Sequence, residues 1–266
     1  MPTDHRLDLY SDLSLTLATA GSGRPALVLH GGGGPATVAG LSAHLARTSH
    51  TITPTHPGWN GTERPDWLTG VDDLALTYLH HLRAQGLRDV LVVGSSLGGW
   101  TAAEMAVRDT AGIITGLVLV NAVGIDVPGE PIPDFFALDA RGIAEHAWHD
   151  SDRYYQDPAL LPPEQLAVTR ANMATLRTLA GDPGMYDPKL LNRLRHADVP
   201  TLLLWGESDR IVTPAYAQTY ANAFPDAHLE IIPKAGHLPH IEQPEATFAA
   251  LDAYLDRLNS TAASSR

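Results

Sequence analysis

Ser96 is distinctive because glycine lies two residues away on both sides, in the run Gly94-Ser-Ser-Leu-Gly98. Small residues at these positions suit a sharp strand-to-helix turn that presents a serine hydroxyl, because the backbone segments around such a turn approach closely. A serine hydroxyl is a poor nucleophile at neutral pH, so it needs a histidine to accept its proton and a carboxylate to orient that histidine. Ser96 is therefore the candidate nucleophile, and its neighbour Ser95 is expected to be structural.

The candidate acid is Asp209, in the run Trp205-Gly-Glu-Ser-Asp209, which follows a continuous apolar segment. A side chain just beyond the end of a buried strand lies where an open α/β sheet has its ligand crevice. Asp126, which follows the preceding predicted core strand, is the alternative acid.

The candidate base is His237, in the run Ala235-Gly-His237, which follows another apolar segment. His240 lies three residues later, but only His237 directly follows glycine. The chain order serine, acid, histidine is one of the known orders of a catalytic triad.

Four glycines follow His30, from Gly31 to Gly34. Amide groups in a glycine turn can point at a developing oxyanion without obstruction by side chains, and the N–H of Leu97, at the start of the predicted helix, is a second donor. We expect His30 to tie this loop to its neighbours rather than to act as a second catalytic histidine. The run lacks the Gly-Lys-Ser/Thr ending of a phosphate-binding loop, so no cofactor is expected.

The segments around these residues alternate between short apolar runs and helical patterns. Continuous apolar runs suit strands buried on both faces, as in a parallel sheet. Such strands are expected over 26–29, 90–93, 117–120 and 202–205, and the segments 51–53 and 229–232 add two more strands. The alternating run 13–17 is expected in an antiparallel edge hairpin, and apolar residues at helical spacing predict a helix over 71–82. This order predicts an α/β fold with a mostly parallel sheet flanked by helices.

The stretch 124–198 contains several prolines and no convincing strand. Its helical segments, such as 164–179, are expected to form a helical lid inserted after the sixth strand. The predicted division is a core of 1–123 and 199–258, a helical cap over 124–198 and a flexible tail over 259–266.

Together these motifs resemble the α/β-hydrolase family, in its serine hydrolase branch of esterases and enol-lactonases. The resemblance extends from residue 26 to the helix after Pro244, and it also rests on His56-Pro-Gly-Trp-Asn-Gly61 and on Glu242-x-Pro244. It implies an eight-stranded sheet. It further implies that the residue after His-Gly, here Gly32, is the second oxyanion donor, with Gly33 as the alternate.

Composition excludes several kinds of partner. The 266 residues carry a formal net charge of −12, whereas nucleic acids and anionic membrane surfaces bind clustered Lys and Arg. The absence of cysteine excludes disulfides and thiolate chemistry. No segment is apolar enough for a secretory signal or a membrane span, so a cytoplasmic location is predicted. No metal is expected, because no metal-ligand spacing joins His44, His50, His80, His81, His146, His149 and His196.

The predicted reaction is hydrolysis of a small, largely apolar carboxylic ester or lactone through an acyl-enzyme on Ser96. Serine at this position argues against the family's haloalkane dehalogenases and epoxide hydrolases, whose covalent intermediates need a carboxylate nucleophile.

Two alternatives stay open. One is a carbon–carbon hydrolase acting on ring-cleavage products of aromatic degradation, which the glycine loop resembles. That group usually has Trp after the triad histidine, where this chain has Leu238, and Pro-Gly where this chain has Pro35-Ala36. The other is a non-catalytic receptor that uses the same pocket to bind a small molecule.

Overall fold

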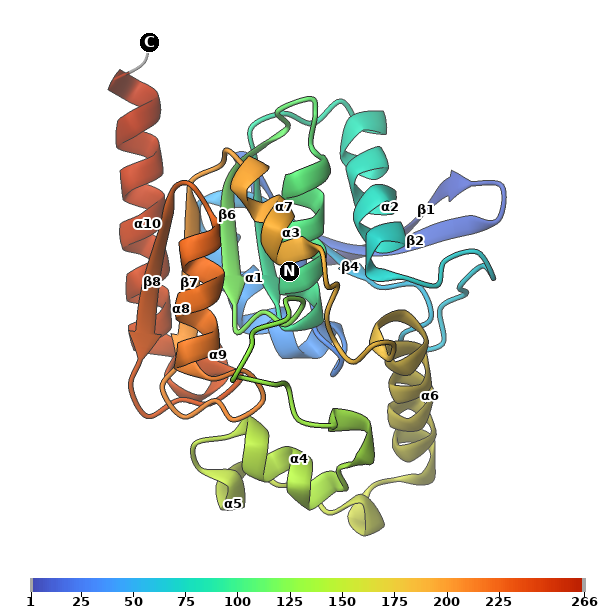
Figure 1. Ribbon diagram of the computed structural model, residues 1–266. Coiled ribbons are helices and arrows are strands. Elements are labelled where there is room, and N and C mark those ends of the chain that lie inside the picture. Colours follow the sequence, from blue (N-terminus) through green and yellow to red (C-terminus); the bar gives the residue numbers. More distant parts are fainter. Residues whose placement is uncertain (1, 265–266) are drawn as a thin grey trace.

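The structure, a computed structural model, describes residues 2–264. An eight-stranded sheet forms its centre, in the order β1-β2-β4-β3-β5-β6-β7-β8 (Figure 1). β1 and β2 form an antiparallel hairpin and β2 runs antiparallel to β4, whereas every other neighbouring pair is parallel. The strands are β1 (Thr3–Tyr10), β2 (Leu13–Ala20), β3 (Arg24–Leu29), β4 (Ser49–Thr55), β5 (Val90–Ser95), β6 (Ile114–Val120), β7 (Thr201–Gly206) and β8 (Ala227–Ile232). The predicted α/β fold, with its edge hairpin and mostly parallel sheet, is confirmed.

Helices cover both faces of the sheet. The α-helices within residues 2–264 are α1 (Ala39–Leu45), α2 (Val71–Ala84), α3 (Leu97–Arg108), α4 (Ala140–Ala147), α5 (Ser151–Tyr154), α6 (Pro163–Ala180), α7 (Leu190–Arg193), α8 (Pro214–Ala223), α9 (Pro239–Glu242) and α10 (Pro244–Ser264). Of these, α2, α3 and α8 pack on one face of the sheet and α1 and α10 on the other. Short 3₁₀ turns span Pro35–Val38, Phe135–Ala137, Pro158–Leu160 and Leu194–His196.

Alternation along the strands divides the core in two, because successive side chains of a strand point to opposite faces. One apolar cluster contains Leu27, Val92 and Leu119 together with residues of α2, α3 and α8. The other contains Val28 and Val93 together with residues of α1 and α10. Strands β3, β5, β6 and β7 are thus buried on both faces, as their continuous apolar runs predict.

Helix α2 shows how the local sequence sets an element. The apolar stripe that predicted it is buried along its whole length, at Val71, Leu74, Ala75, Tyr78, Leu79 and Leu82. At its start, the carboxylate of Asp73 accepts hydrogen bonds from the N–H groups of Thr69 and Gly70, at 2.9 and 3.0 Å. This acidic side chain fixes the first turn and complements the helix dipole.

The chain between β6 and β7 contains helices α4 to α7 and no strand of the sheet. α6 corresponds to the helix predicted over 164–179. Figure 1 shows α4 and α5 beyond the carboxyl ends of the parallel strands, with α6 to one side of them. That this segment works as a lid, with the boundaries 124 and 198, stays a prediction.

The C-terminal segment differs from its expected form. Helix α10 continues through Asn259 to Ser264, in keeping with the high helix propensity of its alanines. The predicted tail is therefore helical as far as residue 264; its flexibility stays a prediction, and residues 265–266 lie outside the described part of the chain.

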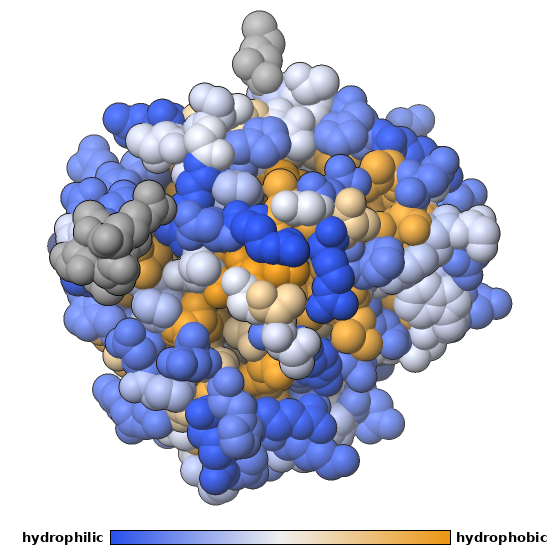
Figure 2. Space-filling model, turned by 90° about the horizontal axis from the view of Figure 1, so that it is seen from above, coloured by the Kyte–Doolittle hydropathy of each residue, from blue (hydrophilic) through white to orange (hydrophobic). Residues whose placement is uncertain are grey.

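No helix within residues 2–264 is both long enough and apolar enough to span a membrane. Figure 2 shows the face on the side away from α4 and α5. Polar side chains cover most of this face, and hydrophobic ones are visible between them near its middle.

Two glycines allow the turn between β5 and α3 to sit against β3. A Cβ on Gly94 would lie 2.1 Å from the carbonyl oxygen of Gly98, and a Cβ on Gly98 would lie 2.3 Å from the carbonyl oxygen of Leu29. In both cases the obstructing atom belongs to the backbone, so no side-chain rotation relieves the clash.

We expect Gly94→Ala to lower the free energy of unfolding by about 3 kcal/mol, because the backbone must move apart to admit the methyl group. Gly40→Ala is the matched control: in α1 its added methyl group would meet only Phe248, at 3.9 Å. This control should be neutral or more stable by up to about 1 kcal/mol. Urea unfolding of both variants tests the expectation, which equal stability of the two would contradict.

Candidate active site

Ser96 occupies the turn between β5 and α3 with a left-handed backbone, at φ 54° and ψ −116°. This conformation is unusual for a residue other than glycine and is a common feature of functional sites. The Ser96 side chain does not cap α3, so its hydroxyl is available to a base. The N–H groups of an α-helix point toward its N-terminus, which in α3 is the end at Ser96. The first of them, beginning with that of Leu97, therefore have no acceptor within the helix.

His237 approaches Ser96 from the loop after β8. Its Nε2 lies 2.9 Å from Ser96 Oγ, and its Nδ1 lies 2.7 Å from Asp209 Oδ2. Since the carboxylate can only accept, Nδ1 carries the ring proton and Nε2 is left to accept the serine proton. The geometry is that of a nucleophile, a base and an orienting acid.

Asp209 is held in the loop after β7 with its side chain fully buried. Its Oδ1 accepts from the N–H groups of Ile211 and Val212 at 2.8 and 3.2 Å. Its Oδ2 accepts from the Asn121 side chain at 2.6 Å as well as from His237. These donors hold the carboxylate in one orientation and compensate for its burial.

The alternative residues do not join this arrangement. Asp126 is exposed, and the imidazole Nδ1 that it would have to reach is bonded to Asp209. His240 instead lies with its Nε2 2.8 Å from the carbonyl oxygen of Thr37, and burial lowers its pKa to about 4. Ser95 is buried beneath the turn, as a structural residue would be.

Sequence reasoning missed the part played by Asn121. It directly follows β6, and besides donating to Asp209 its Oδ1 accepts from the N–H of Gly206 at 3.3 Å. The signal for Asn121 in the sequence was a polar residue at the end of a buried apolar run. An amide side chain is not a nucleophile, a base or an acid, so this signal alone did not indicate a role in the site.

Glu242 was noticed only as part of a motif, and the structure gives it a definite place. Its carboxylate accepts from the N–H of Gly236 at 2.6 Å and from the N–H groups of His149 and Asp150 at 3.0 and 3.2 Å. It thereby joins the loop of His237 to the segment after α4. The N–H of His237 itself donates to the carbonyl of Ala147 at 2.6 Å.

Two buried histidines hold the glycine loop. The backbone N–H of His56 donates to Nε2 of His30 at 2.9 Å, so the His30 ring proton sits on Nδ1, which lies 2.7 Å from the Gly31 carbonyl. Nε2 of His56 donates to the His30 carbonyl at 2.8 Å, and its Nδ1 accepts from the Tyr78 hydroxyl at 2.6 Å. Burial lowers the pKa of both rings, that of His56 to about 4, so both are neutral near pH 7, as this arrangement requires.

A cavity of about 580 Å³ opens over Ser96 and His237. Gly31, Gly32 and Gly33 line it, and a Cβ on Gly31 would lie only 2.9 Å from that of Ser96. The remaining walls come mainly from α4 and α6, with Leu238 and Ile241. The lining contains no Lys, Arg, Asp or Glu.

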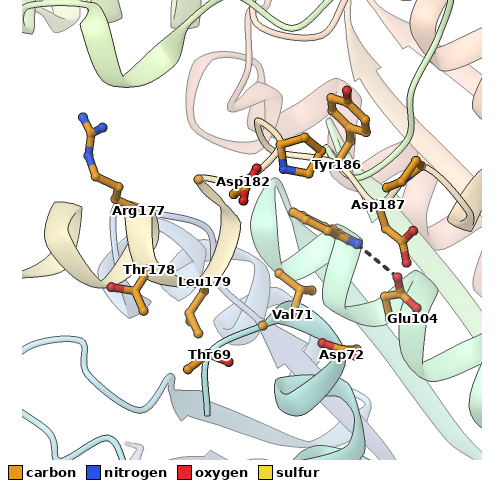
Figure 3. A pocket seen from close by; sticks show the side chains of 15 residues that line it. Thr69, Val71, Asp72, Glu104, Arg177, Thr178, Leu179, Asp182, Tyr186 and Asp187 are labelled. Carbon is orange, nitrogen blue, oxygen red and sulfur yellow. Dashed lines mark hydrogen bonds between the residues drawn. The ribbon is translucent and has the colours of Figure 1, made fainter. Parts of the chain in front are cut away.

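A second cavity, of about 550 Å³, lies where the end of α6 and the loop 181–188 meet α2 and α3 (Figure 3). The dashed line in Figure 3 marks the hydrogen bond from Trp100 to Glu104 at 3.3 Å. Burial raises the pKa of Glu104, and its ion pair with Arg108 opposes this effect. Asp187 is paired with Arg193 at 2.8 Å, so two of the acidic groups at this cavity have partners within the protein. No nucleophile and base meet there.

Among residues 2–264 no group of three or more His, Asp or Glu side chains is placed to hold a metal ion. The grouped side chains of the first cavity have the arrangement that acyl transfer requires, a serine hydroxyl beside a histidine ring whose other nitrogen meets a carboxylate.

Several known hydrolases are similar to this chain. One curated relative, 2-hydroxy-6-oxo-6-(2'-aminophenyl)hexa-2,4-dienoic acid hydrolase of Metapseudomonas resinovorans, is 28% identical over 90% of this chain and 86% of its own. Lipase 3 of a Moraxella strain is 25% identical over 89% of this chain and 79% of its own. A crystal structure of a thermophilic esterase from Thermogutta terrifontis superposes with a TM-score of 0.73, at 21% identity over 96% of this chain and 99% of that one.

A model of the alpha/beta hydrolase family matches residues 26–251. That match spans the whole sheet from β3 to β8, the turn at Ser96 and the loops of Asp209 and His237, and on this ground the chain belongs to the alpha/beta hydrolase family.

Proposed function

We propose that this hydrolase cleaves uncharged carboxylic esters or lactones through an acyl-enzyme on Ser96. Ser96 Oγ attacks the carbonyl carbon while His237 Nε2 takes its proton, and Asp209 stabilises the imidazolium. The tetrahedral intermediate then collapses, and His237 returns the proton to the departing alkoxide. Water, deprotonated by His237, attacks the acyl-enzyme and releases the carboxylic acid.

The oxyanion of each tetrahedral intermediate is assigned to the amides of Leu97 and Gly32, with Gly33 as the alternate donor. The Leu97 amide is at the start of α3, where the dipole favours negative charge. Gly32 supports this role because it lines the cavity next to the nucleophile. Fixed donors at such positions are among the largest contributions to catalysis.

The observation that carries the choice of substrate is the absence of charged side chains from the cavity lining. A ring-cleavage product carries carboxylates, and a buried carboxylate without a partner costs several kcal/mol. None of the arginines of the segment 124–198 lines this cavity, and two of them have partners elsewhere. Arg141 pairs with Glu145 and Asp152, and Arg177 stacks on Phe136 and donates to its carbonyl.

The second candidate is carbon–carbon hydrolysis of a vinylogous keto acid. Its support is the 28% identical relative, whose name describes that reaction. The same nucleophile, base and oxyanion donors can serve both reactions, so only the substrate separates the two candidates.

Ser96→Ala should abolish turnover, with a loss in kcat on the order of 10⁶-fold, because it removes the hydroxyl that is hydrogen-bonded to Nε2 of His237. Its circular dichroism and unfolding midpoint should match those of the wild type. Labelling the wild type with an organophosphonate should place the adduct on Ser96, and an adduct on Ser95 or Ser208 would refute the assignment.

Asp209→Asn should lower kcat on the order of 10⁴-fold, because an amide presents a hydrogen to His237 Nδ1 and leaves the ring in the wrong tautomer. Asp126→Asn is the control and should keep kcat within about twofold, since substitutions at exposed positions usually have small effects. Steady-state kinetics on one aryl ester compares them, and the reverse order of rates would move the acid to Asp126.

For the wild type, we expect kcat/KM on an uncharged short- or medium-chain ester or lactone to exceed that on a vinylogous keto acid by at least ~10²-fold, the effect of about 2.7 kcal/mol of unpaired charge. A panel of acyl chain lengths, lactones and one ring-cleavage product provides the measurement. Faster cleavage of the carbon–carbon substrate than of every ester and lactone would establish the second candidate instead.

A further inference from the structure

Helix α6 is largely exposed, and its attachment to the rest of the protein is concentrated in a few residues. Its buried residues are Asn172, Leu176, Leu179 and Ala180, all in its second half. Three of these are apolar. Asn172 is the only polar residue of α6 that is buried, and it is 7% exposed.

Asn172 makes two hydrogen bonds to a single residue of the loop after β4. Its Oδ1 accepts from the backbone N–H of Asn60 at 2.8 Å, and its Nδ2 donates to Asn60 Oδ1 at 3.0 Å. One turn along the helix, the Thr175 hydroxyl lies 3.1 Å from the Gly58 carbonyl. A paired amide contact of this kind fixes both distance and orientation, whereas apolar packing allows sliding.

The loop after β4, to which Asn172 is hydrogen-bonded, is itself hydrogen-bonded to the glycine loop 31–34. Trp59, adjacent to Asn60, donates from its indole to the carbonyl of Gly32 at 2.9 Å. A Cβ on Gly34 would lie 3.5 Å from Asn60 Oδ1 and 3.7 Å from Asn172 Nδ2, so the amide pair packs directly against this end of the loop. On the other side, a Cβ on Gly32 would lie 2.8 Å from a methyl group of Leu176.

We infer that Asn172 is a positioning residue for the oxyanion loop: through Asn60 and Trp59 it fixes the Gly32–Gly33 peptide, which directly follows the Gly32 amide and carries the N–H of the alternate donor, Gly33. The inference rests on the proposed function only in that it requires an oxyanion to form beside Ser96. It gives α6 a part in the chemistry, in addition to its part in the cavity wall.

The test uses the full chain with Asn172→Ala, Asn60→Gly and the double variant, and Thr178→Ala as control. Glycine at position 60 tolerates its φ of 50°. Thr178 lies on the same helix, but its hydroxyl bonds only to Ala174 within α6, and it lines the second cavity, as Figure 3 shows.

We expect Asn172→Ala to lower kcat on the order of tenfold, a part of the 10²–10³-fold that loss of a whole oxyanion donor costs. KM should stay within about threefold.

The affinity for an alkyl boronic acid, which forms a tetrahedral adduct on serine, should fall by the same factor as kcat, because both depend on the oxyanion donors. The double variant should lose little more than Asn172→Ala, since both residues act through one contact. Thr178→Ala should match the wild type.

Hydrogen exchange of the peptide that contains Gly31–Gly34 provides a readout that does not depend on any substrate. It should be faster in Asn172→Ala and unchanged in Thr178→Ala. Three results would each overturn the inference. Two of them are a rise in KM alone and an unchanged kcat. The third is a loss of kcat that is no larger than the loss in the fraction of Ser96 that a phosphonate can label. If the wild type hydrolyses no ester while exchange still responds to Asn172→Ala, the proposed substrate fails and the positioning role stands.

Discussion

The site depends on one constraint, the close approach of the backbone segments around Ser96. Several positions in these segments have no room for a β-carbon and are glycine. β3, β5 and the start of α3 approach so closely that Gly94 and Gly98 contact backbone atoms, and Gly31 lies against the Ser96 side chain. The same crowding recurs at Gly206, whose Cβ would lie 1.9 Å from the carbonyl oxygen of Gly236. Glycines at these crossings allow the end of β3 to lie against the end of β5, and the end of β7 to lie against the loop after β8. Because those strand ends meet at one edge of the sheet, residues from loops far apart in sequence come within hydrogen-bond distance.

Around this edge, backbone groups and uncharged side chains do most of the positioning. His30 and His56 are neutral because burial opposes their protonation, and each uses one ring nitrogen as donor and the other as acceptor. Asp209, which orients His237, and Glu242 are the carboxylate exceptions, and Glu242 accepts from backbone N–H groups. It connects the loop of the base to the segment after α4, while Asn172 connects the glycine loop to α6. The helical segment between β6 and β7 is therefore tied to both sides of the candidate site, to the base and to the oxyanion donors.

The sheet was largely predictable because its signals are local: continuous apolar runs mark β3, β5, β6 and β7, and apolar residues at helical spacing mark α2, which lies between two of the strands. The grouping of Ser96, Asp209 and His237 was predictable for a related reason, since each follows a predicted strand and parallel strands end at one edge; their catalytic roles stay predictions. Asn121 and Asn172 were not predictable, because an asparagine has no distinctive spacing and its partners lie 88 and 112 residues away in the chain. The sequence favoured Gly32 as the second oxyanion donor but left Gly33 open as the alternate, since amide direction depends on loop geometry.

The cavity lining and the protein as a whole differ in charge. The chain carries a net charge of −12, and the segment 124–198 holds twelve acidic and seven basic residues, whereas the cavity lining has none of either. An acidic exterior lowers the local concentration of anions, and a neutral cavity offers them no partner, so both effects favour entry of uncharged molecules. In the proposed reaction the substrate enters neutral and the acid product forms as a carboxylate in the same cavity, close to Asp209. The proposed reaction thus converts a favoured occupant into a disfavoured one, which favours release of the product.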